Sequence, residues 1–499
     1  MSKAVFTKGS ILRHILVMTG ANTIGLVTLF TVDLIDIYFL SLLGQQELAA
    51  AVGFAGTLLF FLTALSIGLQ IAMGALVSRA EGSHDRQLAG RYCSNTLIVS
   101  AMLSIVVCFV GWWFLVDLLS FLGAKGKTLQ FAVAYSSIVL PSTPILAVGM
   151  CAAAALRGVG DARRSMYATL AAALVNAALD PLFIFGFNWG IEGAAAASVM
   201  ARVALVIIAL LSLIKVHRLP VRVSLQDLLD DIKAIFQIGG PAVLTNLATP
   251  IGASYVLKTM SSYGDSAVAG AAILGRVVPV AFAALFALSG AIGPIIGQNA
   301  GAGFYDRVRS VVYNAMLSGV VYVLAVWAVL FLLRGTVIEV FAAQGEAAYL
   351  IDMYSTWLAG GFMFSGMLFV ANASFNNLNL AYAATLLNFG RTLLGVIPLV
   401  ALLSHYYGAV GVLAGEIAGA GLFGIIGFIT VLRYINYLED KHMTVPAHLS
   451  LTDDNTLSGF SSEHSRLGQR CVQHDGEDDE QVDDQQIDGE AAELARRRQ

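Results

Sequence analysis

The stretch NAALDPLFIFGFNWGIEGAAAASVMAR, residues 176–202, places a carboxylate inside a long apolar segment. A charged side chain at membrane depth is costly, so Asp180 calls for a functional explanation. Asn176 lies one helical turn earlier and therefore shares a helix face with Asp180. The small residues at 190–198 suit close contact between helices. We therefore expect two closely packed membrane helices, with a polar site on the first.

The composition extends this membrane assignment to the whole chain. Its 499 residues are 57% hydrophobic and 12% charged, and the mean hydropathy is +0.76. Such a chain cannot form a soluble core with a wettable surface. A membrane helix needs about 20 apolar residues. The sequence thus predicts an all-α integral membrane protein with twelve transmembrane helices, at 14–42, 48–78, 93–117, 128–155, 165–187, 191–214, 235–260, 266–298, 310–333, 347–374, 382–404 and 408–436.

The lysines and arginines predict the topology. They gather at the ends and in alternate connections, at Lys3, Lys8, Arg13, Arg79, Arg86, Arg91, Arg157, Arg163, Arg164, Lys215, Arg218, Arg222, Lys233, Arg307, Arg309, Arg433 and Lys441. The intervening connections hold only Lys125, Lys127 and Arg334. Positively charged connections favour the cytoplasmic side of a membrane. We expect both termini in the cytoplasm and the protein in the plasma (inner) membrane.

The C-terminal end differs in composition from the rest. Residues 453–499 contain 13 acidic side chains against five basic ones, with few apolar residues among them. A segment that can bury so little surface does not fold by itself. We expect residues 437–499 to form an acidic cytoplasmic tail that is disordered from 445 onward. A solvated extension is the favoured interpretation, with a regulatory segment as the alternative.

An internal repeat organises the membrane part. ALSIGLQIAMGALVSRAEGSHDR at 64–86 is similar to ALSGAIGPIIGQNAGAGFYDR at 287–307, about 220 residues further on. This offset spans six helices, an even number, so both halves have the same orientation. They are related by a pseudo-two-fold axis along the membrane normal, and the cavity between them is the natural substrate path. We expect an N-terminal lobe at 1–217, a cytoplasmic linker at 218–234 and a C-terminal lobe at 235–436.

Three motifs resemble the multidrug and toxic compound extrusion (MATE) family. They are Asn-x-x-x-Asp-Pro-Leu-Phe-Ile-Phe-Gly in the fifth predicted helix, ALSGAIGPIIGQNAGAGFYDRV at 287–308, and VDLIDIYFLSLLG at 32–44. The resemblance covers residues 10–436. It implies a twelve-helix, two-lobed antiporter that exchanges organic cations for protons or sodium ions.

Resemblance to the DinF-like branch of this family implies an ion-coupling site in the N-terminal lobe. Members of the branch place there a first-helix Asp, the Asn and Asp of the fifth helix, and a hydroxyl on the sixth. The matching positions are Asp36, Asn176, Asp180 and Ser198. Ser198 stands where the family often has Thr, and either residue offers one oxygen. Asp33 is the alternative first-helix carboxylate, although the distance to the Leu-Gly at 43–44 favours Asp36.

Simple electrostatics gives this site a mechanism. Two carboxylates brought close in a low-dielectric lobe cannot both ionise cheaply. We expect Asp180 to take up a proton near neutral pH, and the resulting shift of the first helix to release the cargo. Sodium is the rival coupling ion, because the carboxylates, the Asn176 carbonyl and the Ser198 hydroxyl are hard oxygen ligands. In the alternative interpretation, Asp180 has a structural role and forms hydrogen bonds between helices.

Other residues are weaker candidates. Glu416 is an intramembrane carboxylate at the repeat position of Ser198. It either attracts a cationic substrate, binds a second proton, or pairs with Arg391 or Arg202. The acidic residues that the NorM-like branch carries on its seventh and tenth helices are missing, so we expect coupling in the N half. Adaptable apolar side chains suit a substrate cavity, and the candidates are Met73, Met150, Tyr255, Phe282 and Phe286.

Three functions follow from these features. The leading hypothesis is a secondary antiporter that exports cationic drugs and dyes, acting as a monomer in the bilayer, without cofactor, enzymatic activity or nucleic-acid partner. The second is an exporter or flippase of lipid-linked or polyanionic metabolites, which should cluster Arg and Lys in its cavity. The third is an intramembrane aspartyl enzyme, although a repeat across the whole membrane part suits alternating access better. The sequence contains no P-loop to couple transport to ATP.

Overall fold

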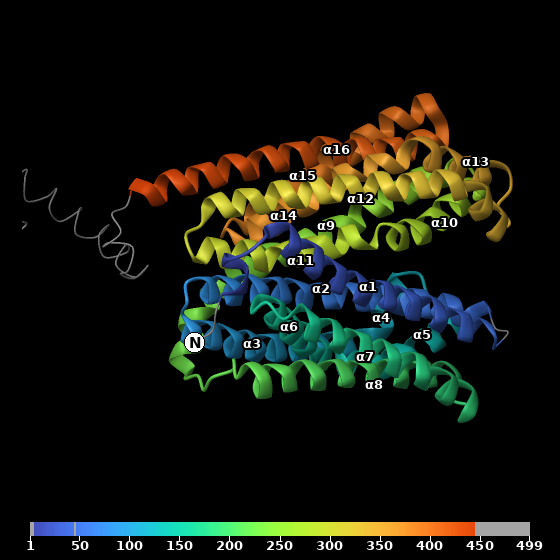
Figure 1. The fold of residues 1–499 in the computed structure, drawn as a ribbon. Coiled ribbons are helices and arrows are strands. Elements are labelled where there is room, and N and C mark those ends of the chain that lie inside the picture. Colours follow the sequence, from blue (N-terminus) through green and yellow to red (C-terminus); the bar gives the residue numbers. More distant parts are fainter. Residues whose placement is uncertain (1–3, 44–45, 445–499) are drawn as a thin grey trace, which may run out of the picture. The chain divides into compact units, whose positions relative to one another are not determined.

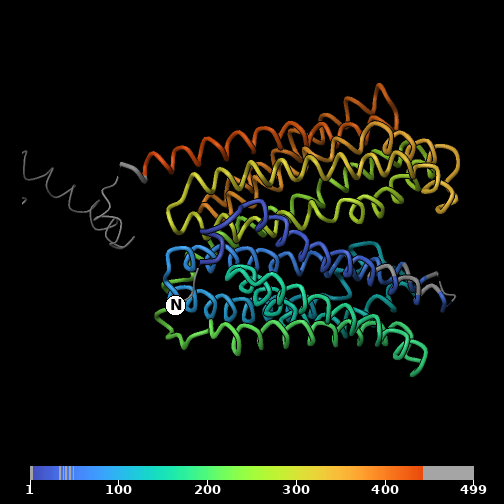
Figure 2. The backbone as a smooth tube through the Cα atoms, viewed as in Figure 1, coloured from blue at the N-terminus to red at the C-terminus, as the bar shows by residue number. Residues whose placement is uncertain are grey.

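The computed structural model describes residues 4–43 and 46–444, and the regular structure in these ranges is helical. Figures 1 and 2 show α1 to α8 running side by side in one half of the bundle and α9 to α16 in the other. The longer helices are α1 (Ile11–Ser41), α2 (Gln46–Gly82), α3 (Arg86–Trp113), α5 (Gly126–Val139), α6 (Thr143–Gly158), α7 (Ala162–Pro181), α8 (Gly190–Leu211), α9 (Leu225–Ser261), α10 (Asp265–Ala281), α11 (Ala283–Gly301), α12 (Tyr305–Val340), α14 (Phe362–Asn377), α15 (Ala381–Gly390) and α16 (Ile397–Thr444).

Shorter elements complete the helical path. They are η1 (Val5–Thr7), α4 (Leu115–Phe121), η2 (Leu140–Ser142), η3 (Leu182–Gly186), η4 (Ser212–His217), α13 (Gly345–Met353), η5 (Tyr354–Leu358), η6 (Ala359–Gly361) and η7 (Arg391–Val396). Several of them join neighbouring helices into one membrane-length segment: α5, η2 and α6 form a single helical path over Gly126–Gly158.

The number of passes agrees with the sequence prediction. Ten helical segments of the described chain are long and apolar enough to cross a membrane. One of them, Ala381–Lys441, contains the non-helical Gly408 (φ 60°, ψ −141°) and therefore makes two passes. The twelfth is α9, whose first turns carry charged residues. The predicted all-α fold with twelve transmembrane helices is confirmed.

Glycines allow the last two membrane passes to pack closely against each other. A Cβ on Gly411 would collide with the Leu403 carbonyl group, and one on Gly415 would lie 2.6 Å from the Val400 Cα atom. Four residues later, a Cβ on Gly419 would lie 2.6 Å from the Val396 nitrogen. The chain after Gly408 thus packs directly on the helix before it. This is the close approach that small residues permit in membranes.

The connection between the halves is shorter than the predicted 218–234. Arg218 adopts a left-handed conformation (φ 47°), and α9 already begins at Leu225. A capping box explains the early start, because the Ser224 and Asp227 side chains each bind the other residue's backbone N–H. The first turns of α9 are anchored by buried Asp231, which accepts a hydrogen bond from Arg91 of α3 at 2.9 Å.

One end of the interface between the halves is tied to the start of the chain. The Phe6 N–H donates to Gln298 Oε1 of α11 at 3.0 Å, and Gln298 Nε2 donates to the Gly158 carbonyl at 2.8 Å. Nearby, a Cβ on Gly82 of α2 would collide with the Gln298 backbone, so α2 and α11 touch directly. The predicted tail has helical residues up to Thr444, and its remainder lies outside the described residues.

Candidate functional site

Asp180 lies where the fifth membrane segment changes its helical form. It is the penultimate residue of α7, and the π-helix η3 begins directly after Pro181. Proline has no N–H to donate to the preceding turn, which favours such a change. The Asp180 side chain is 0% exposed, and neither carboxylate oxygen has a hydrogen-bond donor among the described residues. Asn176 is also buried, and its Nδ2 group has no acceptor among those residues.

Asp36 of α1 faces Asp180. Their carboxyl groups lie within hydrogen-bonding range of each other, although they belong to separate helices. An ionised carboxylate only accepts hydrogen bonds, so this contact becomes a bond when one of the two holds a proton. The side chain of the alternative candidate, Asp33, lies outside the described residues.

Tyr135 connects Ser198 to the carboxylate pair. The Tyr135 hydroxyl lies 3.4 Å from Ser198 Oγ, and Tyr135 has both Asp36 and Asp180 as electrostatic neighbours. The structure therefore brings three of the four predicted residues, Asp36, Asp180 and Ser198, into one polar cluster. Sequence reasoning missed Tyr135 itself. The available signal was a tyrosine in the middle of an apolar segment, next to two serines.

Of the two arginines predicted as partners of Glu416, only Arg391 lies near it. Arg202 Nη1 donates to the Val139 carbonyl at 3.1 Å and to Ser142 Oγ at 2.9 Å, within the first half of the chain. Arg391 is instead the electrostatic neighbour of Glu416, without an ion pair of 4.0 Å or less among the described residues. The Glu416 side chain is exposed, although Val412, one turn earlier, is buried.

Two cavities meet between the halves of the bundle. The first, which we call the N-half cavity, has a volume of about 400 Å³ and is lined by α1, α2, α6, α7, α8 and α11. The second, the C-half cavity, has a volume of about 280 Å³ and is lined by α2, α6, α9, α11, α14 and α15. The two cavities share four lining residues, Gln70, Arg157, Phe286 and Gly290. These residues mark the point where the two cavities meet.

The predicted cavity residues divide into two groups. Met150 lines the N-half cavity, and Phe286 lines both cavities. Met73 and Phe282 are instead fully buried in two separate apolar clusters, and Tyr255 packs against the cluster that contains Phe282. None of these last three lines either cavity. Packing against neighbouring helices accounts for them, because membrane helices bury large side chains on several faces.

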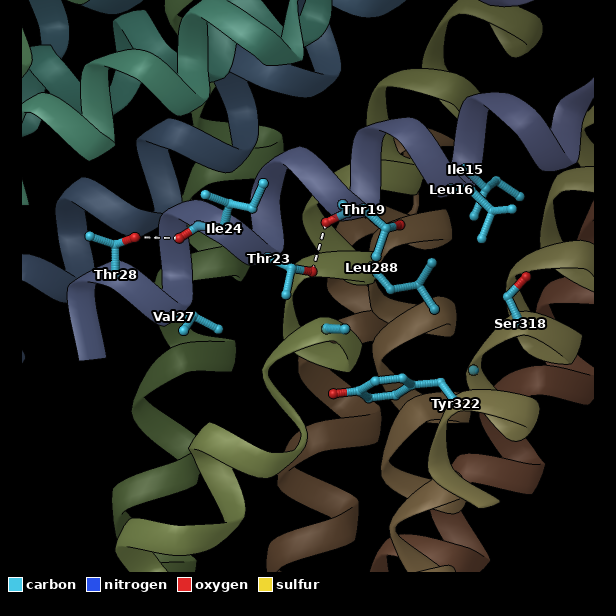
Figure 3. A pocket seen from close by; sticks show the side chains of 13 residues that line it. Ile15, Leu16, Thr19, Thr23, Ile24, Val27, Thr28, Leu288, Ser318 and Tyr322 are labelled. Atoms are coloured by element: carbon cyan, nitrogen blue, oxygen red, sulfur yellow. Dashed lines mark hydrogen bonds between the residues drawn. The ribbon is translucent and has the colours of Figure 1, made fainter. Parts of the chain in front are cut away.

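A third, larger hollow lies beside α1. It has a volume of about 640 Å³ and is bordered by α1, α11 and α12. Figure 3 shows Thr23 and Thr28 turned toward their own helix, where they donate to the carbonyls of Thr19 and Ile24 at 2.7 Å. The Tyr322 hydroxyl donates to the Ala281 carbonyl at 2.7 Å. The hollow is therefore apolar and offers few free polar groups to a ligand.

Arg157 is a candidate functional residue that the sequence analysis did not identify. The sequence placed it in a cytoplasmic connection, but it lies in the last turn of α6 and lines both cavities. Its Nη1 group donates to Ser165 Oγ at 2.8 Å. Among the described residues, no cluster of three or more His, Cys, Asp or Glu side chains could hold a metal ion.

Comparison with known proteins identifies the family. The sequence profile of the MatE family matches this chain twice, at residues 23–182 and 241–401. The chain belongs to the MATE family. The two matches begin about 220 residues apart, which agrees with the offset of the internal repeat. A MATE protein is an integral membrane transporter, and the membrane-length helices agree with this assignment. The DinF-like branch stays a prediction.

Characterised and named relatives cover most of the chain. It is 27% identical over 410 residues to a FAD transporter of Shewanella oneidensis, spanning 80% of this chain and 90% of the relative. It is 24% identical over 440 residues to the probable multidrug resistance protein YpnP of Bacillus subtilis, spanning 88% and 98%. The multidrug export protein MepA of Staphylococcus saprophyticus is 24% identical over 378 residues, spanning 73% and 82%.

Solved MATE structures share this fold. A Vibrio cholerae MATE transporter superposes with a TM-score of 0.82 at 23% identity, covering 86% of this chain and 98% of that one. A Pyrococcus furiosus transporter, whose structure is described as having a binding pocket of reverse polarity, gives a TM-score of 0.81 at 22% identity, covering 88% and 99%. These similarities establish the fold of the MATE chain.

Proposed function

We propose that this MATE protein is a secondary active antiporter that exports organic solutes in exchange for protons. The observation that carries the proposal is the Asp36–Asp180 carboxyl pair, formed by two separate helices of the first half. Asp180 is fully buried and has no basic partner within ion-pair distance among the described residues. Such a pair binds a proton more readily than two separate surface carboxylates do.

Protonation can reach the cargo through α1. This helix carries Asp36 and also lines the N-half cavity with residues from Ala21 to Leu29. Asp36 lies seven residues beyond Leu29, or about 10 Å along a helix that rises 1.5 Å per residue. Loss of the shared proton makes the two carboxylates repel each other and moves α1 relative to α7. The cavity lined by α1 changes its shape with this movement, which couples ion binding to solute binding.

Sodium is the alternative coupling ion. The carboxylates of Asp36 and Asp180 and the hydroxyl of Ser198 are oxygen ligands, and alkali cations bind such hard ligands. A proton needs only the carboxyl pair, whereas sodium needs several oxygens at once. The direct contact of the Asp36 and Asp180 carboxyl groups supports the proton. Transport under a sodium gradient alone decides between the two ions.

The cargo has two candidate classes. Amphipathic cations and dyes are supported by the multidrug names of several relatives. Anionic metabolites are supported by Arg157, which brings a positive charge into both cavities, and by the relative named as a FAD transporter. We further propose a monomer in the plasma membrane with both termini in the cytoplasm, without cofactor or nucleic-acid partner. The alternation of basic connections supports this orientation.

Efflux from cells tests the antiport proposal. Cells that express the protein should extrude ethidium or a fluorescent anionic solute faster than control cells, and a protonophore should abolish the difference. Asp180→Asn should reduce this efflux about tenfold or more, equivalent to about 1.4 kcal/mol of coupling, while the protein stays in the membrane. Undiminished efflux in Asp180→Asn would overturn the proposal. Asp117→Asn, which changes an exposed carboxylate of α4, is the matched control.

A further inference from the structure

The charge balance at the meeting point of the two cavities is unusual. Among the described residues that line the N-half and C-half cavities, Arg157 is the only one with a charged side chain. A guanidinium has five N–H donors. The Ser165 hydroxyl accepts a hydrogen bond from one of them, which leaves others for a ligand. Arg157 makes no ion pair of 4.0 Å or less with a carboxylate of the described residues. A positive charge without a counter-charge in such a place favours an anionic ligand.

The C-half cavity adds carboxamide groups. Six of them line it, from Gln70, Asn246, Asn372, Asn376, Asn377 and Asn388. Asn388 Nδ2 donates to Asn372 Oδ1 at 2.9 Å, which uses one of the possible pairings. The Oδ1 atoms of Asn376 and Asn377 are buried without a donor among the described residues. A buried acceptor without a partner is costly, and a ligand N–H would remove that cost.

Carboxamides suit one kind of ligand in particular. Asn and Gln present a donor and an acceptor side by side, the arrangement that also recognises the edges of nucleobases. Gln70 lines both cavities. It is therefore placed to bind the edge of a heterocycle close to Arg157.

Two aromatic rings form an apolar surface beside these polar groups. Phe286 lines both cavities and Phe369 lines the C-half cavity. Their ring centroids lie 5.1 Å apart with an angle of 40° between the planes. A flat ring of a ligand can stack on either face, and such stacking tolerates many ring types. An aromatic wall, carboxamide edges and one guanidinium thus line two adjoining cavities.

We propose that the meeting point of the two cavities binds an anionic heteroaromatic solute. Its phosphate or carboxylate group contacts Arg157, its ring stacks on Phe286 and Phe369, and its polar ring edge contacts the carboxamides. This inference rests on the proposed function, because it names the cargo of the antiporter. A planar cation such as ethidium fits the aromatic wall but meets the like charge of Arg157.

Equilibrium binding to the purified protein in lipid nanodiscs tests the site without any ion gradient. Flavin mononucleotide and riboflavin share one ring system and differ by a phosphate group. The wild-type protein should bind flavin mononucleotide about tenfold or more tightly than riboflavin, as a charge-assisted hydrogen bond implies. It should bind ethidium more weakly than either. Equal affinity for the two flavins, or preference for ethidium, would overturn the proposed ligand class.

Matched variants assign the selectivity to residues. Arg157→Gln should remove the preference for flavin mononucleotide, and Arg157→Lys should restore part of it. Gln70→Leu should weaken both flavins alike, and it tests the site even if Arg157 is needed for folding. Arg163→Gln, which removes an exposed arginine outside both cavities, should change nothing. Retained preference in Arg157→Gln would overturn the role of Arg157.

The outcomes separate this site from the antiport mechanism. Arg157-dependent binding of flavin mononucleotide, without transport under any ion gradient, would leave the site standing and remove the proposed function. Gradient-driven export of ethidium, without selective flavin binding, would leave the antiporter standing and remove the site. Asp180→Asn should bind flavin mononucleotide within about threefold of the wild type, because it lines neither cavity.

Discussion

The hydroxyl of Tyr135 lies 3.4 Å from that of Ser198 and joins Ser198 to the carboxyl pair. The repeat equivalents, about 220 residues further on, are Tyr354 and Glu416, which are again electrostatic neighbours. Each half of the bundle thus places a tyrosine against a polar residue of its sixth helix. Among the described residues, only the first half adds a pair of carboxylates, so the two halves share a fold but differ in the polar groups they carry.

Removal of the Tyr135 hydroxyl should weaken coupling without unfolding the protein. Tyr135→Phe keeps the ring and removes the contacts of the hydroxyl with Ser198 and the carboxyl pair. We expect proton-driven transport to fall about threefold to tenfold, the effect of one hydrogen bond. Transport rates measured between pH 6 and 8 check this prediction. Tyr167→Phe, at an exposed tyrosine of α7, is the control, and an equal effect of both changes would speak against Tyr135.

Neutralisation of Glu416 should leave the antiport largely intact. Its electrostatic neighbours are Arg391 and Tyr354 of the second half, whereas the carboxyl pair belongs to the first. We expect Glu416→Gln to transport within about threefold of the wild type, since distant sites act independently. Proton-driven transport of both variants, Glu416→Gln and Asp180→Asn, checks this. A loss in Glu416→Gln as large as that in Asp180→Asn would place the coupling site in the second half.

A larger residue at Gly415 should open the hairpin of the last two passes. Its Cβ would lie 2.6 Å from the Val400 Cα atom, and a helix backbone cannot yield as a flexible side chain can. Gly415→Ala should cost about 1–3 kcal/mol in stability, as overpacking does, and lower the melting temperature in detergent. Gly275→Ala in α10, where no atom lies within 4 Å of the added Cβ, should be neutral or stabilising. Equal melting temperatures for both variants would contradict the packing.

The Asp161 side chain should make stability depend on pH in the acidic range. Burial of this carboxyl opposes ionisation, but hydrogen bonds from His217 and Arg164 outweigh it and hold the Asp161 pKa below its ordinary value. Because the pKa of Asp161 is lower in the folded protein than in the unfolded chain, its ionised form stabilises the fold. This contribution is complete when the pH is above the pKa of the unfolded chain, about 3.9. The contribution is lost as the pH falls below that value.

The same residue gives a simple measurement. Asp161→Asn should lower the melting temperature at pH 7, where the lost bonds are worth about 1–3 kcal/mol. The difference from the wild type should shrink as the pH falls below about 4. Asp117→Asn, at an exposed carboxylate, should show no such pattern. A difference that stays constant from pH 7 to pH 3 would refute the assignment.

The apolar stretches predicted the membrane passes because lipid requires about 20 apolar residues per helix. Helix ends depend on single side chains, which explains the larger error at α9. Its Ser224–Asp227 capping box was visible in the sequence, but the ten residues before the predicted start at 235 contain several charges. Only Asp231 among them is buried, and its hydrogen bond from Arg91 of α3 is a tertiary effect that hydropathy does not detect.

The candidate site was predictable in part. A carboxylate within an apolar helix is visible in the sequence, so Asp180 could be found from its cost alone. Tyr135 and Arg157 were missed, because a tyrosine in a membrane helix and an arginine near a helix end are ordinary features that give only a weak signal. Their roles follow only from the placement of Tyr135 beside Ser198 and of Arg157 between two cavities.

The most direct test of the coupling claim uses purified protein in proteoliposomes with an imposed gradient of either protons or sodium ions. The wild type should drive solute transport under a pH gradient alone, and neither Asp180→Asn nor Asp36→Asn should do so, although both should still exchange labelled solute without a gradient. Proton-driven transport at the wild-type rate in Asp180→Asn would contradict the account.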